Sequence, residues 1–124
     1  MDEITVRRVY DAPEPDDGIR VLVDRLWPRG VSKERAAVDE WLKEVAPSNE
    51  LRTWYHKDAS RYPEFDSRYR QELDEGAAAE ALDRLLELAG GGPVTLVTSV
   101  KNIEGSHVPT LVDLLERDAR QRDR

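Results

Sequence analysis

One stretch, VLVDRLWPRG at positions 21–30, constrains the fold of this chain more than any other. It begins as an apolar run rich in valine, which is the pattern of a strand buried on both faces. It ends with Pro28 and Gly30, which do not continue a central strand. Ligands of open α/β sheets bind beyond the carboxyl ends of the strands. The stretch therefore predicts a buried strand that ends at a ligand-binding loop carrying Asp24, Arg25, Trp27 and Arg29.

Two further apolar runs predict strands on either side of this one in the sequence. The predicted strands cover residues 4–10, about 20–26, and 94–100. The loop between the first two is rich in turn residues and shorter than the dozen residues that a parallel crossover usually needs. The first two strands are therefore either antiparallel neighbours or not neighbours in the sheet.

Apolar residues at helical spacing predict about five helices in the remaining chain. They are expected over 33–46, after Ser48, from Pro63 to Gly76, over 77–89, and after Ser106. Trp41 and Trp54 fall on the apolar faces of two of these helices, so core positions are predicted for both. Residues from Arg117 onward are polar and are expected to fray into solvent.

The order strand, strand, four helices, strand, helix predicts an α/β fold with a small sheet. We expect about three strands, largely parallel or mixed, layered with about five helices. The length of 124 residues fits a single domain over 1–124, with 117–124 as a polar frayed tail.

Composition narrows the functional classes. The chain has no cysteine, which excludes disulfides, thiolate metal sites and thiol catalysis and fits a reducing cytosol. No apolar stretch approaches the roughly 20 residues of a membrane span, and the N-terminus is acidic where a signal peptide would be basic. The formal net charge of −7 disfavours nucleic acid as a partner. We therefore expect a cytoplasmic protein that does not bind membranes.

The loops after the second and third predicted strands share one edge of the sheet if those strands are parallel. That arrangement brings Asp24, Arg25, Trp27 and Arg29 near Lys101, Ser106 and His107. The arginines and the lysine supply positive charge, and the start of the last helix favours anions. The predicted ligand is a phosphate or carboxylate, bound by Arg25, Trp27, Arg29, Lys101 and Ser106. No metal-binding, Walker A, GxGxxG or GxSxG motif is present.

His107 and Asp24 are the candidate catalytic residues of this edge. A helix start and neighbouring cations keep an imidazole neutral, and a neutral His107 near Asp24 can act as a general base. The alternative is that His107 only caps the helix or binds a backbone carbonyl. Asp24 can equally fix the loop through an arginine, and Trp27 can be a core residue. We predict that Asp24 is largely buried and bonded to an arginine or to loop N–H groups.

Three blocks of this sequence resemble a known family. They read VYDAPEPDDGIRVLVDRLWPRGVSKE, DEWLKEVAPSNELRTWY and YPEFDSRYRQEL. The chain is similar in these blocks to the YeaO-like branch of the domain-of-unknown-function family four-eight-eight, and the resemblance covers nearly the whole chain. It implies a small α/β protein of bacteria or archaea and does not specify a reaction.

The resemblance weakens after the last predicted strand. Family members often read YAAKD-x-x-HNHA in this region, and Lys101 and His107 fit that pattern. Thr98 replaces the tyrosine, Gly105 the first histidine and Ser106 the asparagine. The departure bears on any family activity that depends on the first histidine.

Two functional hypotheses follow from the sequence. The first is a small α/β protein that binds an anionic small molecule at the carboxyl edge of its sheet. The alternative is a non-catalytic interaction or regulatory module, which the highly charged surface and the missing motifs favour. The sequence indicates neither a cofactor nor an oligomeric state.

Overall fold

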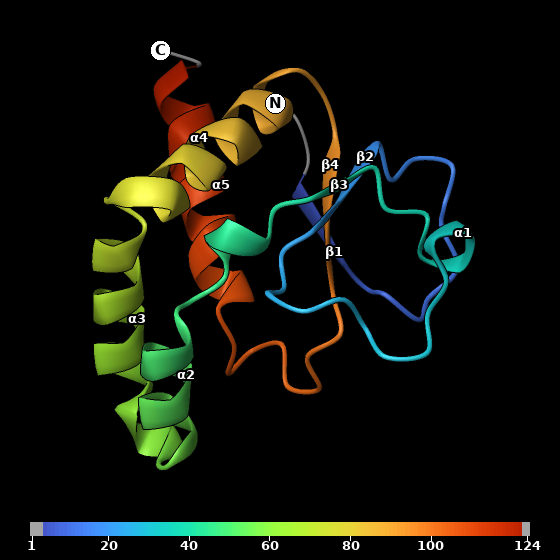
Figure 1. The fold of residues 1–124 in the computed structure, drawn as a ribbon. Helices are drawn as coiled ribbons and strands as arrows, with labels where there is room; N and C mark the ends of the chain where they lie inside the picture. The colour runs from blue at the N-terminus through green and yellow to red at the C-terminus, as the bar shows by residue number, and fades with distance from the viewer. Residues whose placement is uncertain (1–3, 123–124) are drawn as a thin grey trace.

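A computed structural model describes residues 4–122, and its centre is a four-stranded sheet (Figure 1). All strand pairs are parallel, and the strands lie in the order β1-β4-β2-β3. The strands are β1 (Ile4–Arg8), β2 (Ile19–Leu22), β3 (Glu40–Trp41) and β4 (Val94–Thr98). The predicted α/β class with a small parallel sheet is confirmed. Because β4 lies between β1 and β2, the first two strands are not neighbours, which was one of the two predicted alternatives.

Five helices accompany the sheet, and most of them lie on one of its sides (Figure 1). They are α1 (Lys33–Ala36), α2 (Asn49–His56), α3 (Tyr62–Glu72), α4 (Gly76–Gly90) and α5 (Val108–Arg122). Successive strand residues point to opposite faces. Val21 and Leu96 face the helices and pack in the main core with residues of α3, α4 and α5, such as Tyr69, Leu85 and Leu111.

The other face of the sheet has a much thinner cover. Leu22 and Val97 point to this side and form a smaller core with Val9, Val31 and Ala36. Only α1 and the loops around it cover these residues, as Figure 1 shows. The two central strands, β2 and β4, are therefore buried on both faces, as the sequence predicts for strands of this kind.

The helix predicted over 33–46 is wrong, and the error explains the extra strand. The helix ends at Ala36 because Ala37 takes a left-handed conformation with φ of 51°. Asp39 then pairs with Arg20 at the edge of β2, where its N–H donates to the Arg20 carbonyl over 2.8 Å. β3 follows directly and pairs with β2. The cross-strand hydrogen bonds outweigh the helical spacing of the apolar residues, a common override of local propensity.

Two further predictions differ from the structure: the core position of Trp41 and the frayed end from Arg117. Trp41 lies on the edge strand β3 with 38% of its surface exposed, whereas Trp54 packs against the main core. α5 continues through Arg122, and Ala119 on this last part is buried, so the frayed tail expected from Arg117 is not seen up to that residue. Residues 123–124 lie outside the described part.

A buried ion pair lies beside the start of β2. Arg20 Nη1 donates to Asp17 Oδ2 over 2.7 Å, and both side chains are almost fully buried. The Arg20 guanidinium also donates to the carbonyls of Ala36 and Ala37. Gly18 lies between the two charges with φ of 67°, and a Cβ there would stand 2.2 Å from the Pro93 carbonyl oxygen. Only glycine fits this close approach.

Candidate functional site

The loops that follow β2 and β4 meet at the carboxyl edge of the sheet, because the two strands are parallel neighbours. Between these loops and α2 lies a cleft of about 740 Å³. The structure brings all seven predicted site residues to its lining: Asp24, Arg25, Trp27, Arg29, Lys101, Ser106 and His107. The sequence therefore predicts where these residues gather, while their roles depend on what each side chain already bonds.

Asp24 is largely buried, with 7% of its surface exposed, and its carboxylate accepts three hydrogen bonds. The hydroxyl of Thr98 donates to Oδ1 over 2.7 Å. The N–H and hydroxyl of Ser99 donate to Oδ2 over 2.7 and 3.0 Å. Burial and a loop N–H partner match one of the two predicted alternatives, and two hydroxyl groups complete the set of donors. Asp24 thus joins the end of β2 to the end of β4.

His107 lies at the floor of the cleft with 6% of its surface exposed. Its Nε2 is 2.8 Å from the Val23 carbonyl oxygen and 3.8 Å from Asp24 Oδ1. Because a carbonyl only accepts, Nε2 carries the proton of the neutral ring. Burial lowers the pKa of His107 below its usual value, although the Val23 carbonyl and the Asp24 charge oppose this shift. The imidazole is therefore a neutral donor that holds the β2 end.

Three predicted ligand-binding side chains already have partners within the protein. Arg25 donates to the carbonyls of Ala46 and Pro47 over 2.8 and 3.2 Å. The Trp27 indole N–H donates to the Val31 carbonyl over 2.7 Å. Ser106 Oγ accepts from the N–H of residue 108 and so caps α5, as predicted. These contacts shape the cleft and leave little free hydrogen-bonding capacity in the three side chains.

Arg29 and Lys101 differ from the other predicted residues. Both side chains are exposed and line the cleft, and neither has a hydrogen bond or ion pair with any residue in the range 4–122. Arg52 also lines the cleft and makes only one long bond, of 3.3 Å, to Asn49. The cleft thus gathers four cationic side chains, Arg25, Arg29, Arg52 and Lys101, around the single carboxylate of Asp24.

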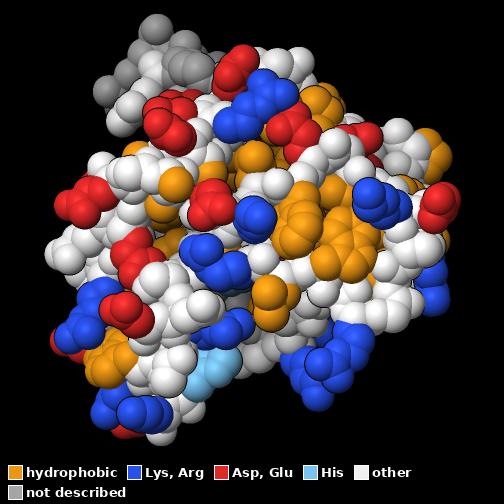
Figure 2. Space-filling model, viewed as in Figure 1, with side chains coloured by type: hydrophobic (Ala, Val, Ile, Leu, Met, Phe, Trp, Pro, Cys, Tyr) orange, Lys and Arg blue, Asp and Glu red, His pale blue; other side chains and the backbone are white. Residues whose placement is uncertain are grey.

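The excess of positive charge in the cleft contrasts with the chain as a whole, whose formal net charge is −7. Figure 2 shows one face of the molecule, on which basic side chains and a histidine gather in the lower part, while acidic side chains are most frequent above and to the left. A concave surface lined by one sign of charge concentrates ions of the opposite sign. The cleft is therefore electrostatically suited to an anion.

The wall formed by the loop after β4 is held in place by two tyrosines. Tyr55 of α2 donates its hydroxyl to the Gly105 carbonyl, and Tyr62 of α3 donates to the Ser106 carbonyl, each over 2.9 Å. Burial raises the pKa of both hydroxyls, which keeps them protonated donors at neutral pH. The loop backbone is fixed to the helical layer, so the shape of the cleft does not depend on a ligand.

The site residues predicted from the sequence do not include Arg52, Tyr55 or His56. All three lie on α2 and line the cleft. Arg52 and His56 are four residues apart and so share one side of a helix, which is the signal that could have identified them. Within residues 4–122, no group of three or more His, Cys, Asp or Glu side chains is placed to hold a metal ion.

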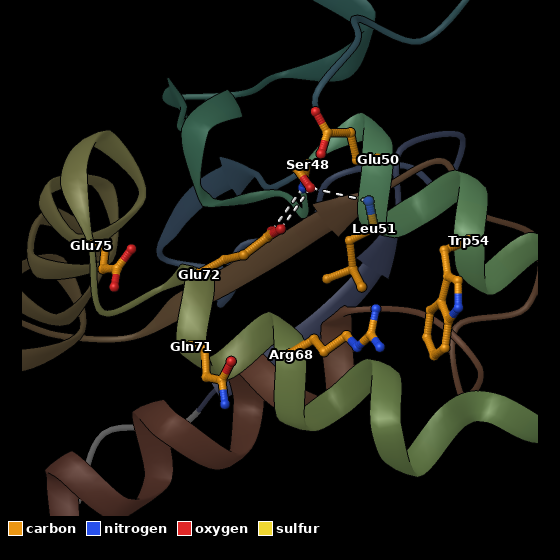
Figure 3. Close-up of a pocket in the computed structure, with 8 residues that line it drawn as sticks. All are labelled: Ser48, Glu50, Leu51, Trp54, Arg68, Gln71, Glu72 and Glu75. Carbon is orange, nitrogen blue, oxygen red and sulfur yellow. Dashed lines mark hydrogen bonds between the residues drawn. The ribbon is translucent and has the colours of Figure 1, made fainter.

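A second pocket of about 380 Å³ lies between α2 and α3 (Figure 3). Figure 3 shows Ser48 bonded to Glu72 and Leu51; the Ser48 hydroxyl donates to Glu72 Oε2 over 2.6 Å and accepts from the Leu51 N–H over 3.1 Å. The guanidinium of Arg68 lies 4.3 Å from the centroid of the Trp54 ring. These groups are satisfied within the protein, so this pocket has the chemistry of a helix cap rather than of a ligand site.

Comparison with known proteins identifies the family of this chain. A family model described as the inactive DUF488-N3 subclade matches residues 3–124. The chain belongs to this DUF488-N3 subclade. The predicted resemblance to the YeaO-like branch is confirmed by its relatives.

The uncharacterized protein YeaO of Escherichia coli is 44% identical to this DUF488-N3 chain, over 90% of the chain and 96% of YeaO. The uncharacterized proteins Rv3073c of Mycobacterium tuberculosis and Mb3100c of Mycobacterium bovis are each 48% identical, over 90% of the chain and 92% of their own length. No solved structure matches the chain. Within the described residues, no helix has the length and apolar character that crossing a bilayer requires.

Gly105, one of the three positions that differ from the pattern expected for the family, lies in the cleft wall. A Cβ at Gly105 would stand 2.6 Å from the Asn102 side-chain nitrogen and 3.5 Å from the Tyr55 hydroxyl. Asn102 and Tyr55 thus fill the space into which a larger side chain at position 105 would begin to extend. A histidine there would require the Asn102 side chain to move.

Proposed function

We propose that the cleft at the carboxyl edge binds a small anion, a phosphate or a carboxylate, and holds it without chemical turnover. One observation carries this proposal: the exposed side chains of Arg29 and Lys101 lack partners within residues 4–122. An anion bound between them would gain charge-assisted hydrogen bonds at little cost, because no internal ion pair has to break first.

Binding without turnover is supported by the state of the two candidate catalytic groups. The carboxylate of Asp24 already accepts three hydrogen bonds. His107 is held through Nε2 at the Val23 carbonyl, and only 6% of its surface is exposed, which limits the access of a ligand to Nδ1, the basic nitrogen of this tautomer. A general base must reach the proton that it removes. We therefore propose that Asp24 and His107 position the two loops. The family description, inactive, and the glycine at position 105 agree with this proposal.

The experiment measures thermal stability in a buffer of low ionic strength with inorganic phosphate or acetate as the probe. A ligand at a hundredfold excess over its Kd should stabilise the protein by about 2.7 kcal/mol. The Arg29→Gln/Lys101→Gln double variant should lose most of that shift. The matched control, Arg35→Gln/Lys33→Gln, removes the same charge from α1 outside the cleft and should keep it.

An equal response of the two double variants would overturn the proposal, because it would show that the anions act through net charge alone. Absence of any shift for the wild-type protein up to millimolar concentrations would do the same. Isothermal titration at two salt concentrations completes the test, since binding to exposed cations weakens as salt increases.

A non-catalytic interaction module remains the second candidate, and the rim of the cleft favours it. Leu26 is 69% exposed, and Trp41 packs edge-on against Trp27 with a centroid distance of 5.6 Å. Figure 2 shows large hydrophobic side chains at the surface of the face in view. If a protein partner covers this rim, Leu26→Ser should abolish its capture while leaving the phosphate response unchanged.

A further inference from the structure

The volume of the cleft is far larger than an inorganic anion needs. One water occupies roughly 30 Å³ of liquid, so a cavity of about 740 Å³ has room for roughly 25 waters. Cavities of this size usually hold organic ligands, and most of their lining is apolar. A phosphate or a short carboxylate between Arg29 and Lys101 would leave most of the cleft filled with water.

The rest of the lining is mainly apolar. Leu26, Trp27, Pro28, Pro47, Phe65 and Val100 all contribute to it. Arg29 and Lys101 line the same cleft as these apolar residues. A ligand whose charged group reaches these cations therefore lies against apolar side chains at the same time.

From this juxtaposition we infer that the ligand is an organic anion, with its charged group at Arg29 and Lys101 and an apolar body of one or two rings in the cleft. The inference rests on the proposed function and adds the chemical class of the ligand. Water next to the apolar wall gains few hydrogen bonds, and its displacement by a ring is favourable.

The fixed walls strengthen the inference. Tyr55 and Tyr62 hold the loop after β4 through hydrogen bonds to backbone carbonyls, and Arg25 holds the other loop to the carbonyls of Ala46 and Pro47. A cleft that is already shaped pays little conformational entropy when a rigid ring enters it. A ring is therefore favoured over a flexible chain of the same apolar area.

The test is a series of phosphonates with one charged group and a growing body: methylphosphonate, phenylphosphonate and 1-naphthylphosphonate. Calorimetry should give a Kd that decreases at least tenfold from methyl to phenyl and decreases again from phenyl to naphthyl. A tenfold gain corresponds to burial of about 60 Å² of apolar surface, which is part of one ring. The phosphonates cannot be hydrolysed, so a hidden phosphatase activity does not affect the result.

Two variants test whether the gain in affinity from the ring depends on the apolar lining of the cleft. Leu26→Ser should weaken phenylphosphonate several-fold and leave methylphosphonate unchanged; because Leu26 is 69% exposed, its loss should not unfold the protein. Tyr10→Ser is the matched control, since Tyr10 is half exposed and outside the cleft lining. It should change neither affinity.

The outcomes separate the two proposals. Equal affinity for all three phosphonates would overturn the inference and leave the proposed function standing. Absence of binding for all three would overturn both. If uncharged 1-naphthol bound as tightly as 1-naphthylphosphonate, the cleft would be an apolar site, and the proposed anion function would fail.

Discussion

The two ends of β2 use charge in opposite ways. Beside its start, the Asp17–Arg20 pair is buried, and the guanidinium also binds the carbonyls of Ala36 and Ala37. Beyond its end, the exposed side chains of Arg29 and Lys101 line a cleft and bond to no other residue within 4–122. The chain therefore contains one closed charge network and one open group of cations, only a strand apart.

The difference shows which charges stabilise the fold and which are available to a ligand. A buried charge must be paired, because an unpaired one is costly, so the network at Asp17 is a condition of folding. An exposed cation in a concave site carries no such condition. By this criterion Asp24 and His107 belong with the closed network although they lie on the floor of the cleft.

The largest expected effect is at the closed end. Arg20→Met should reduce the free energy of unfolding by about 3–5 kcal/mol, because it leaves the Asp17 carboxylate buried without its main partner. Urea denaturation measures this loss. Glu64→Gln, which breaks an exposed pair with Arg68, is the control and should cost less than about 1 kcal/mol. A similar cost for both variants would remove the distinction between closed and open charges.

Asp24 gives the next largest effect. Hydrogen bonds to a charged group contribute about 1.5–3 kcal/mol each, and their contributions overlap. Asp24→Ala should therefore cost about 2–4 kcal/mol in urea melts, less than the loss of one half of a buried ion pair, because Thr98 and Ser99 are neutral donors. Asp24→Asn should cost less than the alanine variant. If both variants were as stable as the wild type, Asp24 would not join the strand ends.

A pH effect follows from the burial of His107. Burial lowers the pKa of His107 in the folded protein, while the unfolded value is about 6.5. Below pH 6.5 the unfolded chain binds the proton more readily, so stability decreases as the pH falls, by up to about 1.4 kcal/mol per pH unit. Above pH 7 this contribution is constant.

Urea melts at pH 7.5, 6.5 and 5.5 measure the decrease. His107→Gln should flatten it, because glutamine has no proton to gain and can still donate to the Val23 carbonyl. His56→Gln is the matched control at an exposed histidine and should keep the wild-type dependence. An unchanged decrease in His107→Gln would assign the effect to other groups.

The sequence predicts three of the four strands, and it predicts which residues follow them in the loops, because both depend on local patterns. The run at 94–100 is rich in β-branched residues, and its first part, Val94–Thr98, forms the central strand β4. The loop at 24–29 combines charges with a proline after a strand, and its residues line the cleft. Neither result needs knowledge of distant contacts.

The predictions fail where distant residues decide the outcome. The apolar residues of the segment at 37–41 have helical spacing, but its backbone pairs with β2. Nothing within the segment itself indicates that β2 is its partner. Likewise, the sequence cannot show that Arg25 binds carbonyls near residue 46 while Arg29 binds none. Which cation is free depends on tertiary contacts, not on residue type.

The smallest expected change in the free energy of unfolding tests the comparison between the two ends of β2 most directly. Arg29→Gln/Lys101→Gln should change the free energy of unfolding by less than about 0.5 kcal/mol, as substitutions at exposed positions without partners usually do. Four cations and one carboxylate line the cleft, so relief of the repulsion among the cations offsets part of any loss. Urea melts at low and high salt measure both contributions, because salt screens the repulsion. A loss above 1 kcal/mol would show that the two cations have structural partners, and the open end of β2 would then be as closed as the other.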